Sequence, residues 1–188
     1  MTKQIKILAF SGSTRKDSYN KKLLRETIAL LGKNVAVTVV DLRDFPMPLY
    51  DADLEMEKKV PENAKTIRSL MIAADGFIIT SPEYNGSVSA VLKNTIDWTS
   101  RAEDSIPSLA AYKGKYAFIL STSPGKNGGI HGLSMLESIL KYMGTTVISE
   151  LVAIPYASKV FSEVEATIEQ SYLDKIKTGC EKLIHAVS

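Results

Sequence analysis

Short apolar runs alternate along the chain with longer segments in which apolar residues recur every three or four positions. The runs have the length of strands buried on both faces, and the longer segments have the spacing of amphipathic helices. Strands are predicted at residues 6–11, 35–41, 76–80, 115–121 and 146–154. Helices are predicted at residues 18–31, 61–74, 90–101 and 129–142.

The C-terminal segment shows the same helical spacing. Its apolar stripe consists of Val164, Ile168, Tyr172, Ile176 and Cys180. The stripe is expected to face the core, which makes Cys180 a buried core residue rather than a redox thiol. Residues 42–56 contain Pro46 and Pro48 and are predicted to form a loop.

Strands that alternate with helices indicate an α/β fold with a parallel sheet, because parallel neighbours need long crossovers that are usually helical. The prediction is a three-layer sandwich around a five-stranded parallel sheet of order 2-1-3-4-5. Ligands bind such a sheet at the carboxyl ends of its strands, near the point where the strand order reverses. Residues 1–188 are expected to form a single domain.

Composition narrows the classes of partner. The 23 basic and 21 acidic residues leave a net charge of +2, and they are scattered, which argues against nucleic acid or an anionic membrane as the main partner. The apolar runs are too short to span a bilayer. One cysteine and two histidines argue against a disulfide and against a resident transition metal. A cytoplasmic location is therefore expected.

The first turn, residues 11–20 after the first strand, carries groups that bind an anion. Ser13 and Arg15 lie within it, and Ser18 and Asn20 stand where the next helix begins. Backbone amides at a helix start favour an anion, and a guanidinium suits phosphate. The glycine spacing matches neither a dinucleotide fingerprint nor a P-loop, so a monophosphate is expected. The alternative is that Ser18 only caps the helix and Arg15 is solvated.

The second turn, residues 81–87 after the third strand, reads Ser-Pro-Glu-Tyr-Asn-Gly-Ser. Its backbone amides can bond the edge of a planar heterocycle, and Tyr84 offers that ring a flat neighbour. Together with a phosphate site, this indicates a bound flavin. The alternative is a well-capped loop in which Tyr84 packs and Asn85-Gly86 is merely a tight turn.

The third turn, residues 122–129 after the fourth strand, contains three glycines that allow the backbone to approach a ligand closely. Taken alone, it would also fit a mobile surface loop. Its position favours the ligand, because all three turns follow strands that are expected to lie side by side.

In these turns the chain resembles the NADPH-dependent FMN reductase family of flavodoxin-like proteins, which includes bacterial chromate, quinone and azo-dye reductases. The resemblance covers nearly the whole chain and is strongest in the first turn and in residues 82–101. It implies a flavodoxin-like fold with FMN as cofactor and NADPH or NADH as electron donor.

The resemblance also implies where FMN binds. It assigns the phosphate to Ser13, Arg15, Ser18 and Asn20. It assigns the ring system to Pro82, Glu83, Tyr84, Asn85, Gly86 and Ser87, with Ser123, Gly125, Gly128 and Gly129 near its other side. No catalytic side chain is implied, because the isoalloxazine carries the chemistry.

The implied function is an FMN-dependent oxidoreductase that passes hydride from NAD(P)H through FMN to a small acceptor such as a quinone, azo compound, chromate, metal chelate or flavin. A homodimer or homotetramer is implied, with Asp97, Trp98 and Arg101 near the contact. Three alternatives stay open: a flavodoxin-like electron carrier, a non-enzymatic FMN-binding module and a flavin-free phosphate-binding protein. A net charge of +2 suits the carrier poorly, because flavodoxins tend to be acidic.

The chain departs from the family pattern at three places. Ser89-Ala90 stands where many relatives have proline-glycine, and His131 and Glu137 stand where arginines are common. His131 is expected to be a solvated helix residue, the alternative being contact with nicotinamide or substrate.

Overall fold

A parallel sheet forms the middle layer of the structure, a computed structural model that describes residues 4–162 and 168–188. Its strand order is β2-β1-β3-β6-β7, and β8 pairs with the distal part of β6. The strands are β1 (Ile5–Ser11), β2 (Val35–Asp41), β3 (Gly76–Thr80), β6 (Tyr116–Thr122), β7 (Thr146–Val147) and β8 (Val152–Ile154). The predicted fold class and the predicted order of the strands are confirmed.

The fifth predicted strand, residues 146–154, is in fact two short strands that both pair with β6. The chain bends between them, where the Leu151 amide donates to the carbonyl of Ser149 (3.2 Å). Glu150 at this bend forms an ion pair with Lys182 instead of continuing the ladder. The sheet therefore has six strands where the sequence predicts five.

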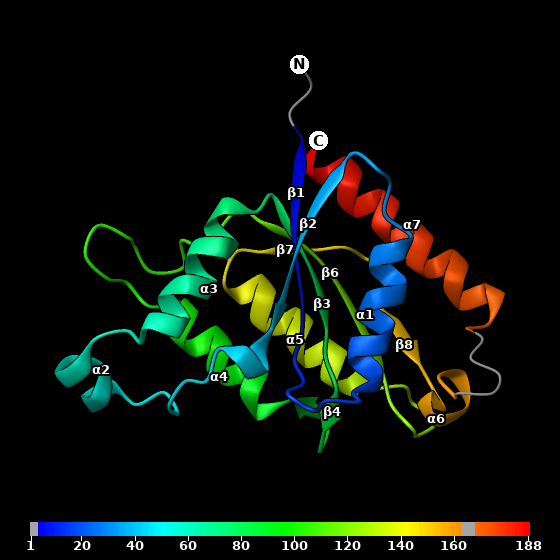
Figure 1. Ribbon diagram of the computed structural model, residues 1–188, viewed down its shortest axis with the longest axis horizontal. Helices are drawn as coiled ribbons and strands as arrows, with labels where there is room; N and C mark the ends of the chain where they lie inside the picture. The colour runs from blue at the N-terminus through cyan, green and yellow to red at the C-terminus, as the bar shows by residue number, and fades with distance from the viewer. Residues whose placement is uncertain (1–3, 163–167) are drawn as a thin grey trace.

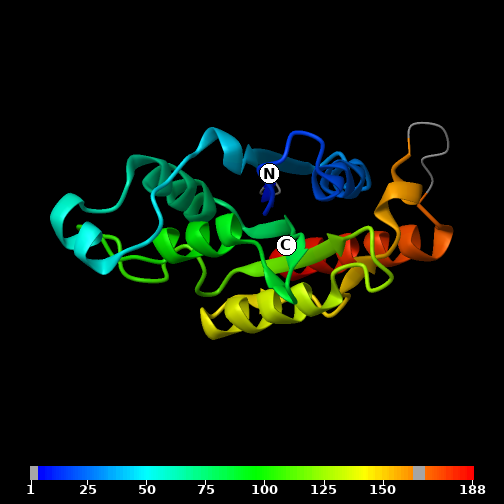
Figure 2. The same ribbon diagram turned by 90° about the horizontal axis from the view of Figure 1, so that it is seen from below.

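Helices cover both faces of the sheet, and Figures 1 and 2 show the two outer layers. On one face lie α1 (Tyr19–Ala29) and α7 (Gln170–Val187). On the other lie α3 (Glu62–Ala73), α4 (Ala90–Thr99) and α5 (Ile130–Tyr142). The last helix begins at Gln170, so Ile168 precedes it, and Val164 lies outside the described residues.

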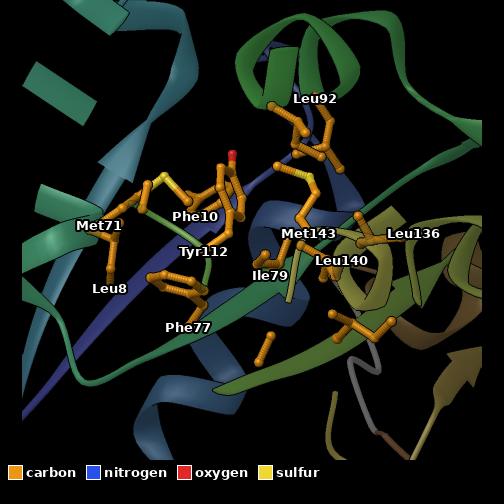
Figure 3. Close-up of a cluster of buried hydrophobic side chains, with 14 of the residues drawn as sticks. Leu8, Phe10, Met71, Phe77, Ile79, Leu92, Tyr112, Leu136, Leu140 and Met143 are labelled. Carbon is orange, nitrogen blue, oxygen red and sulfur yellow. The ribbon is translucent and has the colours of Figure 1, made fainter. Parts of the chain in front are cut away.

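Strand residues alternate between the two cores, as the period of two requires. Ile7 and Ala9 of β1 face α1 and α7, whereas Leu8 and Phe10 face the opposite layer. Figure 3 shows this second core, which contains Phe77 and Ile79 of β3 together with Leu136 and Leu140 of α5.

The segment predicted as a loop, residues 42–56, contains a 3-10 turn (η1, Leu42–Asp44) and a short helix (α2, Ala52–Lys58). Asp51 starts α2, because its carboxylate accepts from the amides of Asp53 (2.8 Å) and Leu54 (3.1 Å). The Trp98 indole holds the preceding loop by donating to the Pro48 carbonyl (2.8 Å). The prolines therefore mark the loop correctly, but the Asp51 cap was missed.

The remaining elements are the hairpin strands β4 (Glu83–Tyr84) and β5 (Ser87–Val88) and the one-turn helix α6 (Ala157–Val160). Within residues 4–162 and 168–188, none of the helices combines the length and the hydrophobicity that a membrane span requires.

Cys180 is a residue of α7, and its side chain is buried in the core between this helix and the sheet, as predicted. Burial, with a further contribution from the neighbouring Glu181 carboxylate, raises the pKa of its thiol to about 12. The thiolate that redox chemistry requires is therefore scarce at neutral pH.

The neighbouring Gly179 lies in the middle of α7 and faces the Phe118 ring of β6. A β-carbon at this position would overlap the ring. The glycine therefore sets how closely α7 packs on the sheet.

Replacing Gly179 with alanine is predicted to lower the free energy of unfolding by about 1–3 kcal/mol, the usual cost of overpacking a core. The loss is expected although alanine is the better helix former. Denaturant unfolding with Thr178→Ala as control, an exposed position of the same helix, measures the effect. Equal or higher stability of Gly179→Ala would contradict the close packing.

Candidate functional site

The three turns lie side by side at the carboxyl edge of the sheet. Ser11, the last residue of β1, is in register with Thr80, which is in register with Leu120 of β6. The strand order reverses between β1 and β3, since β2 lies on one side of β1 and β3 on the other. The turns therefore meet where an open α/β sheet binds its ligand, as the sequence predicts.

Hydrogen bonds join the first and second turns to the strands next to their own. The Gly12 amide donates to the Thr80 carbonyl (2.8 Å), and the Ser81 amide donates to the Leu120 carbonyl (2.9 Å). The ladder of the sheet thus continues one residue into the first and second turns. Their relative positions are fixed by the backbone.

Asn20 connects the first turn to the third. Its side-chain amide donates to the Thr122 carbonyl (2.9 Å) and accepts from the Thr122 amide (3.1 Å). The Thr80 hydroxyl donates to the Asn20 carbonyl (2.9 Å), so the ends of β3 and β6 are both bound to this residue at the start of α1. Asn20 is predicted from sequence to hold phosphate, and this buried network gives it a second role.

The N-terminus of α1 is open to an anion. Ser18 is buried at the N-cap position, yet its side chain makes no capping hydrogen bond, and the first turn of α1 contains no acidic residue. Ser13 is buried nearby, and Arg15 is exposed. The amides of the first helical turn and the positive end of the helix dipole are thus available for a ligand.

The second turn is a β-hairpin. β4 and β5 pair antiparallel across Asn85 and Gly86, whose φ angles of 52° and 75° are typical of a type I′ turn. Tyr84 is 52% exposed at the end of the hairpin. The tight turn predicted as the alternative is present, and it presents the aromatic ring rather than burying it.

Ser89 follows the hairpin and caps α4. Its hydroxyl accepts from the Leu92 amide (3.3 Å) and donates to the Gly12 carbonyl (2.5 Å). A β-carbon on Gly12 would lie 3.0 Å from the Leu92 side chain, so the glycine allows this close approach. Ser89 is therefore the N-cap residue of α4, a role that its type, a preferred cap residue, could have signalled.

Glu83 joins the hairpin to α5, the helix that follows the third turn. Its carboxylate accepts from the Gly132 amide in the first turn of α5 (2.8 Å). α5 has no capping side chain of its own, because its N-cap residue is Gly129. Glu83 therefore acts as a cap supplied from another element, which sequence spacing did not reveal.

The third turn packs its backbone against β8. A β-carbon on Gly128 would lie 2.7–2.8 Å from backbone atoms of Ala153 and Ile154, and φ is 61°. Gly125 accepts from the amides of Gly128 (3.4 Å) and Tyr156 (3.3 Å). Gly128 therefore has a structural reason to be glycine, so a bulky residue there would disturb the fold and would not test ligand binding.

Ser123 lies at the start of this turn, and its backbone forms hydrogen bonds to β8 and α6. Its amide donates to the Ile154 carbonyl (3.3 Å), and its carbonyl accepts from the Ala157 amide (3.0 Å). Gly129 has a φ of 90°, and a β-carbon there would overlap the Ser121 hydroxyl. The turn is thus rigidly placed beside the hairpin.

A group with an anionic end and a planar body fits these residues. The anion is matched by the uncapped start of α1, and the planar body by the exposed Tyr84 ring and the two glycine-containing turns. Among residues 4–162 and 168–188, no group of three or more His, Cys, Asp or Glu side chains is placed to hold a metal ion. FMN has the two parts that the turns accommodate.

His131 and Glu137 lie on α5 beyond the turns. His131 is exposed, and its Nε2 atom lies 3.5 Å from the Asn127 side-chain nitrogen. Glu137 accepts from Lys141 (2.6 Å) on the same helix. The exposed histidine agrees with the solvated interpretation.

An ion pair links α2 to the segment that follows α4. Arg101 donates to Glu55 (2.9 Å), which also accepts from the Tyr50 hydroxyl (2.9 Å). Partial burial opposes ionisation of Glu55, but the bonds from Arg101 and Tyr50 outweigh it and lower the pKa of the carboxyl. Burial and the same carboxylate raise the pKa of Tyr50.

Relatives of known identity match over most of the chain. The quinone reductase of Escherichia coli K12 is 31% identical over 179 residues, which is 94% of this chain and 92% of that protein. The NADPH:quinone oxidoreductase of Arabidopsis thaliana is 39% identical over 126 residues, 66% of this chain, and the match spans only 61% of that protein.

Solved structures agree on the fold. FerB, a flavoenzyme NAD(P)H:(acceptor) oxidoreductase from Paracoccus denitrificans, superposes with a TM-score of 0.78 at 24% identity and covers 97% of both chains. The model of the family described as NADPH-dependent FMN reductase matches residues 5–159. The chain therefore belongs to the NADPH-dependent FMN reductase family and is, as predicted, an oxidoreductase that uses FMN with NAD(P)H as electron donor.

Proposed function

We propose that the three turns bind FMN and that the chain reduces a small acceptor, foremost a quinone, with electrons from NADPH or NADH. The observation that carries the proposal is the network through Asn20, Thr80 and Thr122, which fixes the three turns around one uncapped helix start. Binding groups held in this way need no rearrangement to receive a ligand.

The phosphate end of the site is formed by the first turn. Ser13 and Ser18 offer hydroxyls, and Arg15 offers a guanidinium. The first backbone amides of α1 form the positive end of the helix dipole, which favours an anion. Asn20 holds this arrangement against β6 and can spare one amide proton for the phosphate.

The ring end of the site is formed by the other two turns. Bound FMN supplies the redox chemistry by accepting hydride from NAD(P)H and delivering electrons to the acceptor. The hairpin, Pro82, Glu83, Tyr84, Asn85, Gly86 and Ser87, would border the ring on one side. Ser123, Gly125, Gly128 and Gly129 would border it on the other, where backbone can approach because no side chain intervenes. No side chain of this chain need donate or accept a proton.

A quinone is proposed as acceptor because the relatives from Escherichia coli and Arabidopsis thaliana are both named for quinones. A planar quinone also matches the exposed Tyr84 ring, which can stack on it. We place this reaction in the cytoplasm, in keeping with a single buried cysteine.

A homodimer is proposed as the smallest assembly. Leu49, Met56 and Tyr142 are 77%, 76% and 89% exposed, and a second copy would cover apolar surface of this kind. Trp98, in contrast, is fully buried within its own chain against Tyr50, so its side chain supports the elements near the proposed contact and offers no surface of its own. Asp97 and Arg101 are partly exposed and stay candidates for the contact.

Replacing Arg15 with alanine is predicted to weaken FMN binding about 10- to 100-fold, because a charge-assisted hydrogen bond contributes roughly 1.5–3 kcal/mol. Riboflavin, which lacks the phosphate, should bind the variant and the wild type equally. Quenching of flavin fluorescence on titration of the apoprotein measures both affinities.

Arg25→Ala is the matched control, since Arg25 is an exposed arginine further along α1. It should leave both affinities unchanged. A loss of riboflavin affinity in Arg15→Ala equal to the loss of FMN affinity would contradict the phosphate assignment.

FMN-loaded protein is predicted to oxidise NADPH with 1,4-benzoquinone over many turnovers, at about 1–1,000 per second as is typical of enzymes. Arg15→Ala should show reduced turnover at limiting FMN, restored by excess FMN, since only affinity is affected. Absorbance at 340 nm follows the reaction. Oxidation that stops after one equivalent of NADPH per FMN would instead indicate an electron carrier.

Sedimentation at micromolar concentration is predicted to give twice the monomer mass or more. Tyr142→Ser and Met56→Ser remove apolar surface at two separate places, and at least one of them should shift the equilibrium toward monomer. A wild-type monomer at these concentrations would overturn the proposed assembly.

A further inference from the structure

The hairpin of β4 and β5 is too small to be stable by itself. Each strand contributes two residues, and only two residue pairs face each other. Isolated two-stranded hairpins are marginal even when longer. The position of the second turn must therefore be fixed by what the hairpin packs against.

It packs against the first turn of α5, which Figure 1 shows beside β4 at the lower end of the sheet. A β-carbon on Gly132 would lie 3.1 Å from the β-carbon of Glu83 and 3.1 Å from the Ser87 carbonyl oxygen. Both strands of the hairpin thus approach the helix backbone as closely as a glycine permits.

One directed bond holds this contact, from the Gly132 amide to the Glu83 carboxylate (2.8 Å). Gly132 is the third residue of α5, and its amide is one of those that the helix cannot satisfy itself. The N-cap residue Gly129 has no side chain to serve it, and the first turn of α5 contains no acidic residue. The carboxylate of Glu83 is therefore the capping group and also the negative charge at the positive end of this helix.

We propose that Glu83 is a positioning residue with two effects on the flavin, an assignment that rests on the proposed function. Its hydrogen bond holds the second turn against the first turn of α5, the helix that continues from the third turn, and so sets the distance between the two turns. Its charge offsets the dipole of α5 beside the third turn.

The charge has a consequence for the redox potential. A flavin gains negative charge on reduction, and a helix N-terminus stabilises negative charge. A carboxylate at the same helix end cancels part of that stabilisation. Glu83 thus keeps bound FMN a stronger reductant than the bare helix end would allow.

The conservative variant Glu83→Gln separates the bond from the charge, because its side-chain oxygen still accepts from the Gly132 amide. It should bind oxidised FMN within a few-fold of the wild type. It should bind reduced FMN about tenfold more tightly relative to oxidised FMN, which is a rise of about 30 mV for a two-electron couple. Glu83→Ala loses the bond as well and should bind FMN at least tenfold more weakly.

Glu137→Gln is the control for charge. It removes the same charge from α5 itself, away from the N-terminus, where Glu137 accepts from Lys141. Its flavin potential should equal that of the wild type.

The experiment is a spectroelectrochemical titration of the FMN-loaded wild type, Glu83→Gln and Glu137→Gln, with FMN affinities for these and Glu83→Ala. Amide exchange of Gly132 in the FMN-free proteins gives an independent readout, with exchange at least tenfold faster in Glu83→Ala than in Glu83→Gln. If Glu83→Ala does not fold, the flavin potentials of the wild type and of Glu83→Gln alone test the proposed role of Glu83.

An unchanged potential in Glu83→Gln, or an equal rise in Glu137→Gln, would overturn the assignment while leaving the proposed function intact. So would wild-type FMN affinity in Glu83→Ala. A wild-type protein that binds no FMN would overturn the proposed function, and the assignment with it.

Discussion

A single buried amide, that of Asn20, determines the geometry of the site. Its side chain pairs with both backbone groups of Thr122, and its carbonyl receives the Thr80 hydroxyl. Asn20 and Thr122 are 3% and 2% exposed and Thr80 is fully buried, so these bonds are formed in a place where an unpaired polar group would cost about 1–3 kcal/mol. Because the three partners come from α1, β3 and β6, no two of the turns can separate without breaking the network.

The helices that follow these turns differ at their N-termini, and the difference indicates where an anion binds. α4 is capped by Ser89 and α5 by Glu83, so the amides there are already partly satisfied. α1 has neither a capping side chain nor an acidic residue in its first turn. In the proposed site, the phosphate of FMN would have one open helix end among these three, and the other two helices would hold the turns that are proposed to border the ring.

Much of the fold could be predicted from the sequence because it depends on local pattern. Apolar runs such as residues 76–80 are strands, and alternation with helices requires a parallel sheet. The division of residues 146–154 into β7 and β8 was missed, because no glycine or proline marks the bend between Ser149 and Leu151. The short helix α2 was missed because the two prolines of its segment outweighed the Asp51 cap.

The three turns could be found from the sequence because they also depend on local pattern. The roles of several of their side chains could not be found in this way. Asn20, Glu83 and Ser89 look like ligand or cap residues in the sequence, yet their partners are Thr122, Gly132 and Gly12. Such contacts are set by how helices pack on the sheet. Reading a motif residue by residue therefore assigns to the ligand some side chains that also build the frame around it.

The central claim is that these turns make an NAD(P)H-linked FMN site, and an anaerobic titration of the FMN-loaded protein with NADPH tests it most directly. The account predicts that the visible flavin band bleaches and that bleaching is complete at one equivalent of NADPH per FMN. NADH is to be tested in parallel as the alternative donor. Tightly bound FMN that neither nucleotide reduces, or a protein that retains no FMN, would contradict the account.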